Sequence, residues 1–180
     1  MTHEEGAIVP PALIPLFDAG RQLIKVRGVM LFSLACAALS MWAGVHLAQT
    51  YGLNPADGGV LAPLTVRLAW GIGVALLGVG FAAGMWLYGR CYVARIELDE
   101  ETHQLHVYTV GFFGTARHVY DGTDIVGGHH HRGKLVTLWL SVNAPWRSIW
   151  IAGRRLPLII DEQGEVLHKG WMSRLHLGRR

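Results

Sequence analysis

The sequence predicts an α+β membrane protein, in which a two-helix transmembrane hairpin is followed by a small antiparallel β-rich domain. Three observations predict this class. Two long stretches, residues 29–48 and 68–88, contain no Lys, Arg, Asp or Glu. Only a short segment joins them. After Arg90 the apolar residues recur at every second position, which is typical of strands. We expect the resulting sheet to be curled or to form a partial barrel.

Each uncharged stretch is about 20 residues long, which at 1.5 Å per residue matches a hydrocarbon core of roughly 30 Å. The predicted organisation has five segments. Residues 1–27 form a cytoplasmic or interfacial segment, residues 28–49 the first span, residues 50–67 an external loop, residues 68–89 the second span and residues 90–180 a cytoplasmic β-rich domain.

The basic residues that flank the spans predict the topology. They lie before the first span and after the second: Arg21, Lys25, Arg27, Arg90 and Arg95. The connecting loop has only Arg67 against Asp57. The positive-inside rule then places both termini in the cytoplasm, or in the matrix of a mitochondrion. We interpret the basic charge as a topology signal and a lipid-headgroup contact, and we expect no nucleic-acid partner.

The beginning and the cysteines of the chain favour a bacterial inner membrane. Glu4 and Glu5 precede the first basic residue, unlike a secretory signal or a transit peptide. Either the protein is bacterial or a presequence has been removed, and we prefer the first. Only Cys36 and Cys91 are present, which is no disulfide framework and suits a reducing compartment.

Small residues four apart occur in both spans, as Ser40 and Gly44 in the first and Gly80 and Gly84 in the second. Such spacing leaves a groove that lets another helix approach closely. Either the two spans pack on each other through these residues, or one groove binds a partner subunit. Before the first span, residues 16–25 predict an interfacial helical segment or a loop with a few apolar residues.

The chain after Arg90 predicts a series of short strands. We expect them at residues 92–98, 104–110, 115–120, 134–142, 147–152, 156–160 and 165–168. Residues 99–102 and 111–114 predict turns, residues 121–133 a loop, and residues 170–177 a terminal helical turn.

Three adjacent histidines, His129, His130 and His131, form a candidate transition-metal site, because imidazole binds copper, zinc and nickel. Neighbouring residues of an extended loop point in alternating directions, so a solvated polar loop is the other interpretation. No nucleophile elbow, phosphate loop or metalloprotease motif occurs. We therefore expect no enzymatic activity, no small-molecule substrate and no cofactor other than a possible metal ion.

Trp146 and Trp150 follow the rigid turn at Asn143-Ala144-Pro145. Tryptophans beside arginine are typical of partner interfaces and headgroup contacts. Trp146 packed on the sheet is the alternative.

The layout and three segments together resemble the transmembrane protein 223 family and its relatives. The segments are Asn143-Ala144-Pro145-Trp146, Ile151-x-Gly153-Arg154-Arg155 and Leu158-Ile159-Ile160-Asp161-x-x-Gly164. The resemblance implies a two-pass inner-membrane protein that assists the assembly of respiratory complexes, and it implies no catalytic residues. The histidines at 129–131 are not a feature of that family.

These inferences lead to three hypotheses. The first is a non-catalytic accessory subunit or assembly factor of a larger membrane complex, respiratory or redox in type. The second is a copper- or zinc-binding or delivery protein that uses His129–His131. The third is a module for anionic membrane lipids, bound through Arg147, Arg154, Arg155, Arg179 and Arg180.

Overall fold

The computed structural model describes residues 13–53, 59–131, 133–136, 141–143, 145–167 and 170. The chain divides into two compact units. One unit contains the helical residues Leu23–Cys91 together with Val110–Gly114. The other contains the chain up to Gln22, Tyr92–Thr109 and the chain from Thr115 onward. The predicted α+β layout of two apolar helices followed by antiparallel sheets is confirmed.

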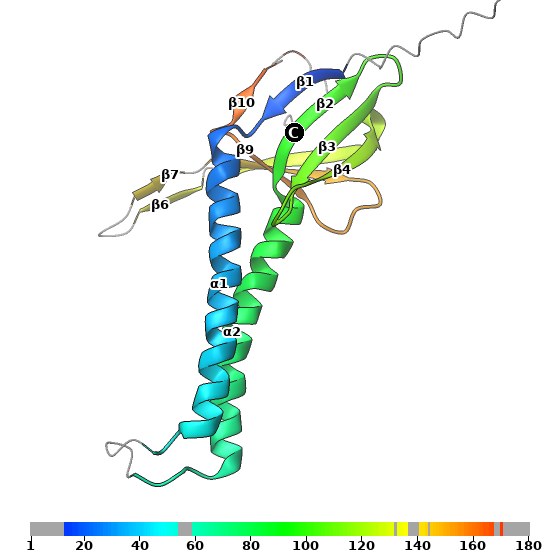
Figure 1. The fold of residues 1–180 in the computed structure, drawn as a ribbon. Coiled ribbons are helices and arrows are strands. Elements are labelled where there is room, and N and C mark those ends of the chain that lie inside the picture. Colours follow the sequence, from blue (N-terminus) through cyan, green and yellow to red (C-terminus); the bar gives the residue numbers. More distant parts are fainter. Residues whose placement is uncertain are drawn as a thin grey trace, which may run out of the picture. The chain divides into compact units, whose positions relative to one another are not determined.

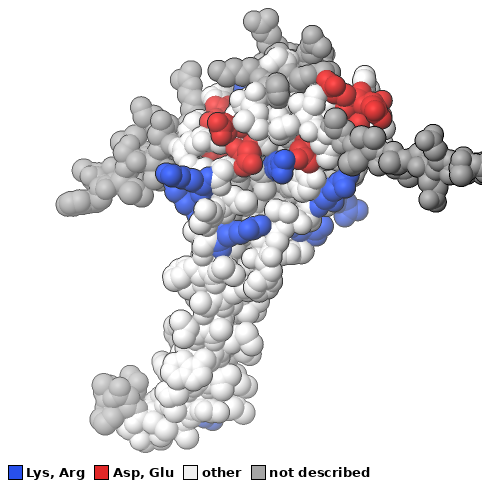
Figure 2. Space-filling view, turned by 45° about the horizontal axis from the view of Figure 1, so that its top comes forward, with Lys and Arg blue, Asp and Glu red and all other residues white. Residues whose placement is uncertain are grey.

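The helical unit is a pair of long helices, α1 (Arg21–Thr50) and α2 (Leu64–Cys91), which run side by side (Figure 1). Both are long and apolar enough to cross a membrane. Only 17% of each apolar window is buried, whereas the core helix of a soluble protein is mostly buried. Figure 2 shows the helix pair almost free of charged residues. Large apolar side chains such as Phe32, Trp42 and Leu77 are exposed on it, and exposed apolar surfaces of this kind are typical of membrane or protein contacts.

The larger sheet has the strand order β10-β1-β2-β3-β4. Its strands are β1 (Leu13–Asp18), β2 (Val93–Asp99), β3 (Gln104–Val110), β4 (Thr115–Asp121) and β10 (Glu165–Val166). Strand β1 pairs antiparallel with both β2 and β10, and β2 pairs antiparallel with β3. The first strand of the described residues is therefore an interior strand of this sheet.

The prediction of an interfacial helix or a loop at residues 16–25 is wrong for its first part, because β1 extends to Asp18. The pairing of β1 with β2 shifts register between Pro15 and Phe17. Proline has no backbone N–H and is tolerated in strands at such irregularities. The shift also lets the adjacent residues Leu16 and Phe17 both be fully buried. It removes the simple alternation by which a strand is recognised in a sequence.

A second sheet has the order β5-β8-β9, formed by β5 (Ile125–His131), β8 (Trp146–Ile151) and β9 (Leu158–Asp161). Two predictions in this region are wrong. Residues 121–133 are not a loop, because a 3-10 turn, η2 (Gly122–Asp124), leads into β5. Residues 134–142 are not one strand, because β6 (Lys134–Val136) pairs antiparallel with β7 (Ser141–Asn143).

The core of the β unit combines apolar residues from both larger sheets. The fully or nearly fully buried ones include Leu16, Phe17, Tyr92, Val93, Ile96, Leu98, Leu105, Val107, Ile149, Ile151, Leu158 and Ile160. Tyr92 joins the sheets through a bridge to Ile159. The described strands form sheets of five, three and two strands and no closed barrel. The helical turn expected at residues 170–177 lies outside the described residues, except for Gly170.

Candidate functional site

The two helices approach each other most closely where glycine faces glycine. A Cβ atom added at Gly71 would lie 2.5 Å from the carbonyl oxygen of Gly44 and 3.1 Å from Cβ of Ala48. A Cβ atom at Gly44 would clash with the carbonyl oxygen of Gly71 in the same way. Helix backbones can come this close only where both lack side chains, which is the physical basis of small-residue packing in membranes.

Further along the pair, Ser40 of α1 lies against Gly78 of α2, where any Cβ atom would clash with the serine side chain. The Ser40 hydroxyl donates to the carbonyl oxygen of Cys36 at 2.5 Å, so it needs no partner from another chain. Ser40 and Gly44 thus take part in the contact between the two helices. Their use by a separate partner subunit stays a prediction.

Gly80 and Gly84 lie in a different setting. Added Cβ atoms at Gly73, Gly80 and Gly84 would meet no atom within 4 Å. Gly73 lies about 200° around the helix from Gly71, and residues seven and eleven positions further share its side. Helix α2 therefore carries two glycine faces. One packs on α1, and the other, formed by Gly73, Gly80 and Gly84, is open; we call it the open glycine face. That a partner helix covers it stays a prediction.

An apolar groove of about 270 Å³ lies beside the Gly44–Gly71 contact. Its walls contain almost no polar surface. They are formed by Met41, Gly44, Val45, Ala48, Leu68, Gly71, Ile72 and Ala75. The groove can hold an aliphatic chain, either a side chain of a neighbouring helix or part of a lipid.

The three histidines lie on β5 and pair across it with β8: His129 with Ser148, His130 with Arg147 and His131 with Trp146. Since successive side chains of a strand point to opposite faces, His130 lies on the other face from His129 and His131. Within the described part of the chain, no three His, Cys, Asp or Glu side chains gather as a metal site would need. The metal site at His129, His130 and His131 stays a prediction without such a cluster to support it.

His130 and His131 have separate contacts. His130 Nδ1 lies 2.7 Å from Oε1 of Glu162, and Arg147 Nη2 lies 3.5 Å from the same oxygen. All three side chains are partly exposed, so these contacts contribute little to stability. The ring of His131 stacks on Trp146 with centroids 3.9 Å apart.

The two tryptophans of β8 differ in exposure. Trp146 is partly covered and its ring stacks on His131. Trp150 is 41% exposed. Trp150 is the more accessible of the two for a partner or a headgroup, and that role stays a prediction.

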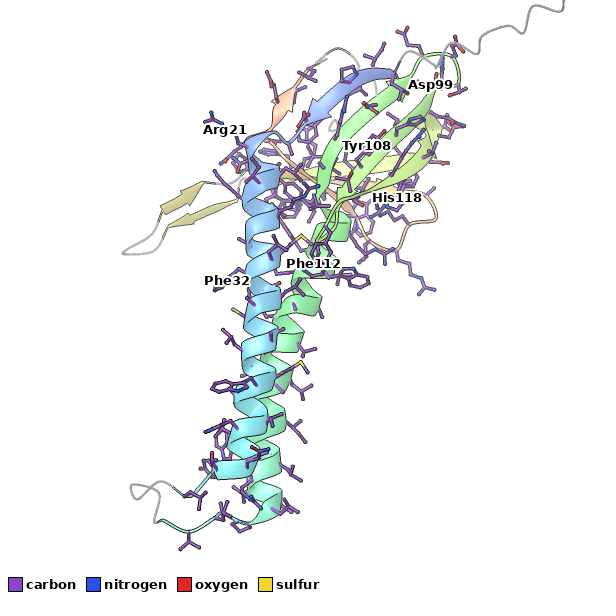
Figure 3. The ribbon with its side chains drawn as sticks, viewed as in Figure 1. Arg21, Phe32, Asp99, Tyr108, Phe112 and His118 are labelled. Atoms are coloured by element: carbon purple, nitrogen blue, oxygen red, sulfur yellow. The ribbon has the colours of Figure 1, made fainter. Side chains whose placement is uncertain are left out.

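Polar residues around Tyr108, which is labelled in Figure 3, form a network on β2, β3 and β4 that the sequence did not reveal. Glu97 is buried, its Oε1 lies 2.6 Å from Nη2 of Arg95, and the hydroxyl of Tyr108 hydrogen-bonds to it. His106 is also buried, and Arg117 donates to its Nδ1 at 2.9 Å. The signal was present, because Arg95, Glu97 and Asp99 alternate with apolar residues. Such alternating charged residues usually form a face exposed to water. Here Glu97 is buried and lies opposite the buried His106 on the neighbouring strand.

The electrostatic effect of this network falls on Tyr108. Its hydrogen bond to Glu97, followed by desolvation and the negative charge of Glu97, raises the pKa of the Tyr108 phenol. At the end of β2, hydrogen bonds from Thr102 and from the backbone of Glu101 lower the pKa of Asp99. These contacts connect β2 with β3 and fix the turn after β2.

The motifs that carried the family resemblance also have structural roles. Arg154 donates to the hydroxyl of Tyr120 on β4 at 2.5 Å, which ties the loop after β8 to the larger sheet. Asp161 accepts from Gln163 N at 2.9 Å and from the Tyr92 hydroxyl at 3.2 Å. A Cβ atom at Gly164 would lie 2.6 Å from the Phe17 ring, so this turn requires glycine.

Comparison with known proteins agrees with this architecture. Residues 20–170 match the TMEM70/TMEM186/TMEM223 protein family, and the chain belongs to this family. The match covers both helices and nearly all the described strands. No curated protein matches the chain.

Proposed function

We propose that this member of the TMEM70/TMEM186/TMEM223 family is a non-catalytic accessory subunit or assembly factor of a larger integral-membrane complex, respiratory or redox in type. The family is associated with the assembly of membrane complexes, which fits an accessory or assembly role in the coarse sense. The kind of complex, the absence of catalysis and the docking surfaces are parts of the proposal.

The observation that carries the docking proposal is the open glycine face of α2. The hairpin is already packed through Gly44, Gly71 and Gly78, so it does not need Gly73, Gly80 or Gly84 to hold its own helices together. An exposed strip without side chains allows a helix of another protein to approach closely. Lipid chains are as apolar as such a helix, so hydrophobicity alone would not drive the two helices together. Shape and close contact, rather than hydrophobicity, would then select the partner.

The β unit supplies the second docking surface of the proposal. The proposed surface is the side of β8 that carries Trp146 and the exposed Trp150. Arg147, which contacts Glu162 together with His130, points to the other side of this strand and is not part of that surface. Aromatic residues and arginine are enriched at the centres of protein interfaces. The metal-delivery hypothesis gains no support from the described residues, because His130 and His131 have separate contacts.

We place the protein in a bacterial cytoplasmic membrane, crossed twice, with both termini in the cytoplasm. Basic residues at the start of α1 and the end of α2 support this orientation: Arg21, Lys25, Arg27 and Arg90. A mitochondrial inner membrane with both termini in the matrix fits the same charges. The family is membrane-associated, and the two helices are long enough for either setting.

The test uses native membranes solubilised in mild detergent, native gel electrophoresis and mass spectrometry of the band that contains the protein. We expect migration with a large complex. Constant stoichiometry in the mature complex would identify an accessory subunit, and presence only in immature intermediates would identify an assembly factor. A band the size of a monomer or small homo-oligomer would refute both.

A pair of variants tests the docking surface. Gly80→Leu fills the open glycine face and should abolish migration with the complex. Ala83→Leu adds apolar bulk to another exposed position, which lies next to Gly84 in the sequence and therefore about 100° around α2 from it, and should leave the complex intact. If both variants still migrate with the complex, the open glycine face is not the docking surface.

A further inference from the structure

The turn between β3 and β4 has an unusual composition for an exposed hairpin. Its two central residues are Phe112 and Phe113, and the backbone N–H of Gly111 donates to the carbonyl oxygen of Gly114 at 2.8 Å. Such positions usually carry Gly, Asn, Asp or Pro, whose side chains are small or polar. Phe113 is instead 89% exposed, and its ring lies 6.4 Å from that of Phe112.

This turn belongs to the helical unit and not to the sheets. Residues Val110–Gly114 cluster with the helices, whereas Thr109 and Thr115 on either side cluster with the strands. Val110 is buried, and a Cβ atom at Gly89 of α2 would lie 2.7 Å from its carbonyl oxygen. Gly89 also meets Met30 of α1, where a Cβ atom would lie 2.6 Å from Cε. The turn is thus held against α2 at the level where Met30 of α1 packs on Gly89, and Phe112 lies beside that end of α2 (Figure 3).

This level has the composition of a membrane–water boundary. Met30 and Gly89 are each within three residues of the nearest basic residue on their helix, Arg27 and Arg90. Arg90 lies over the ring of Trp86, with its guanidinium carbon 5.1 Å from the ring centre. Trp86 and Tyr88 are 45% and 40% exposed. Exposed Trp and Tyr next to a terminal arginine mark the depth at which headgroups meet acyl chains.

We propose that the Phe112–Phe113 turn is a membrane-inserted finger that places its phenylalanine rings among lipid at the boundary between headgroups and acyl chains. The partner is the lipid itself. Lipid is the expected partner because the turn lies at the level where the uncharged parts of both helices end. The exposed rings therefore continue the apolar surface of the helices. The finger is not part of either helix, and it would help to fix how deeply the hairpin lies in the membrane. The proposal depends on the membrane crossing proposed above.

Photo-crosslinking of the full chain tests it. Phe113 is replaced by 4-benzoylphenylalanine, the protein is reconstituted into phosphatidylcholine vesicles, and mass spectrometry identifies what is attached after illumination. Two reference positions receive the same group. Leu77, 76% exposed on α2, reports contact with lipid in the span, and Glu101, exposed in the turn between β2 and β3, reports contact with water. Phe112, replaced in the same way, gives a second measurement from the same turn.

We expect phospholipid adducts at Phe113 in a yield close to that at Leu77 and well above that at Glu101. Lipid adducts at Leu77 but not at either phenylalanine would overturn the finger and leave the membrane crossing intact. Crosslinks from Phe113 to a second copy of the chain in place of lipid would also overturn it. Absence of lipid adducts at Leu77 as well would refute the membrane crossing, and the finger with it.

Discussion

Gly71 and Gly73 provide a matched pair for testing how the two helices are held together. They lie two residues apart on α2, so they share the same depth and the same helix. A Cβ atom at Gly71 would lie 2.5 Å from the carbonyl oxygen of Gly44, whereas at Gly73 it would meet nothing within 4 Å. Gly71→Ala should therefore weaken the helix pair, and Gly73→Ala should not.

The size of the effect follows from that distance. Ordinary contacts of a Cβ atom begin near 3.4 Å, so the alanine methyl at position 71 must push the backbones apart by almost 1 Å. Overpacking of this kind costs about 1–3 kcal/mol. Replacing glycine by alanine in a helix also contributes up to about 1 kcal/mol of stability, but it does so at both positions. The difference between the two variants is then about 1–3 kcal/mol, free of the propensity term.

The assay is unfolding of the full chain in mixed micelles by increasing fractions of SDS. It is followed by circular dichroism at a helical wavelength and by limited proteolysis of the loop between the helices. Gly71→Ala should unfold at a lower SDS fraction than the unchanged protein, and Gly73→Ala at an equal or higher one. Equal midpoints for the two variants would refute the close contact of Gly44 with Gly71.

Two further predictions concern the β unit. Because the hydrogen bond to Glu97 raises the pKa of Tyr108 above its ordinary 10.0, the unfolded chain loses this proton first as pH rises. The folded state should lose stability above about pH 10, and Tyr108→Phe should remove that part of the loss, as measured by denaturant unfolding across this range. Phe17→Ala should cost about 3–5 kcal/mol, because the ring is fully buried. Val119→Ala, at a 47% exposed position, is its control and should change stability by about 0.5 kcal/mol or less; equal losses in the two variants would contradict this account of the core.

The helices could be predicted from the sequence because their signal is local. An uncharged run of membrane length needs no knowledge of the rest of the chain, and the run at residues 68–88 lies within α2. The helices extend beyond the uncharged runs on both sides, since helix formation continues through Arg21 to Arg27 and through Leu64 to Arg67. Charge marks where the apolar part ends, not where the helix ends.

The strands that could not be predicted lack the regular alternation of apolar and polar residues. They form because they pair with strands far away in the chain. Strand β1 has two buried residues in succession because its register shifts at Pro15, and its neighbour β2 lies beyond both helices in the chain. Strand β5 contains glycines and histidines, which have little preference for strands, and it depends on pairing with β8. In both cases tertiary pairing overrides local preference.

Among the predicted interaction residues, spacing alone could identify small residues but could not separate the two faces of α2. Gly71 and Gly73 have the same identity and differ only in direction, which depends on where α1 packs. The burial of Glu97 could not be predicted either, because alternation indicates which residues share a face of a strand but not whether that face is exposed to water.

The two faces of α2 make folding and association separable in this chain. Gly71 and Gly78 are one heptad apart and face α1, while Gly73 and Gly80 repeat the same spacing two residues later and face away from it. A side chain added to the first pair must destabilise the hairpin before any partner is considered. A Cβ atom added to the second has no described neighbour within 4 Å, so any effect beyond the gain in helix propensity points to what lies outside the hairpin. A hairpin that acts alone needs a glycine face on only one side of the helix. A helix that packs closely between α1 and a third helix would use glycine faces on two sides. An accessory or assembly role would use that arrangement.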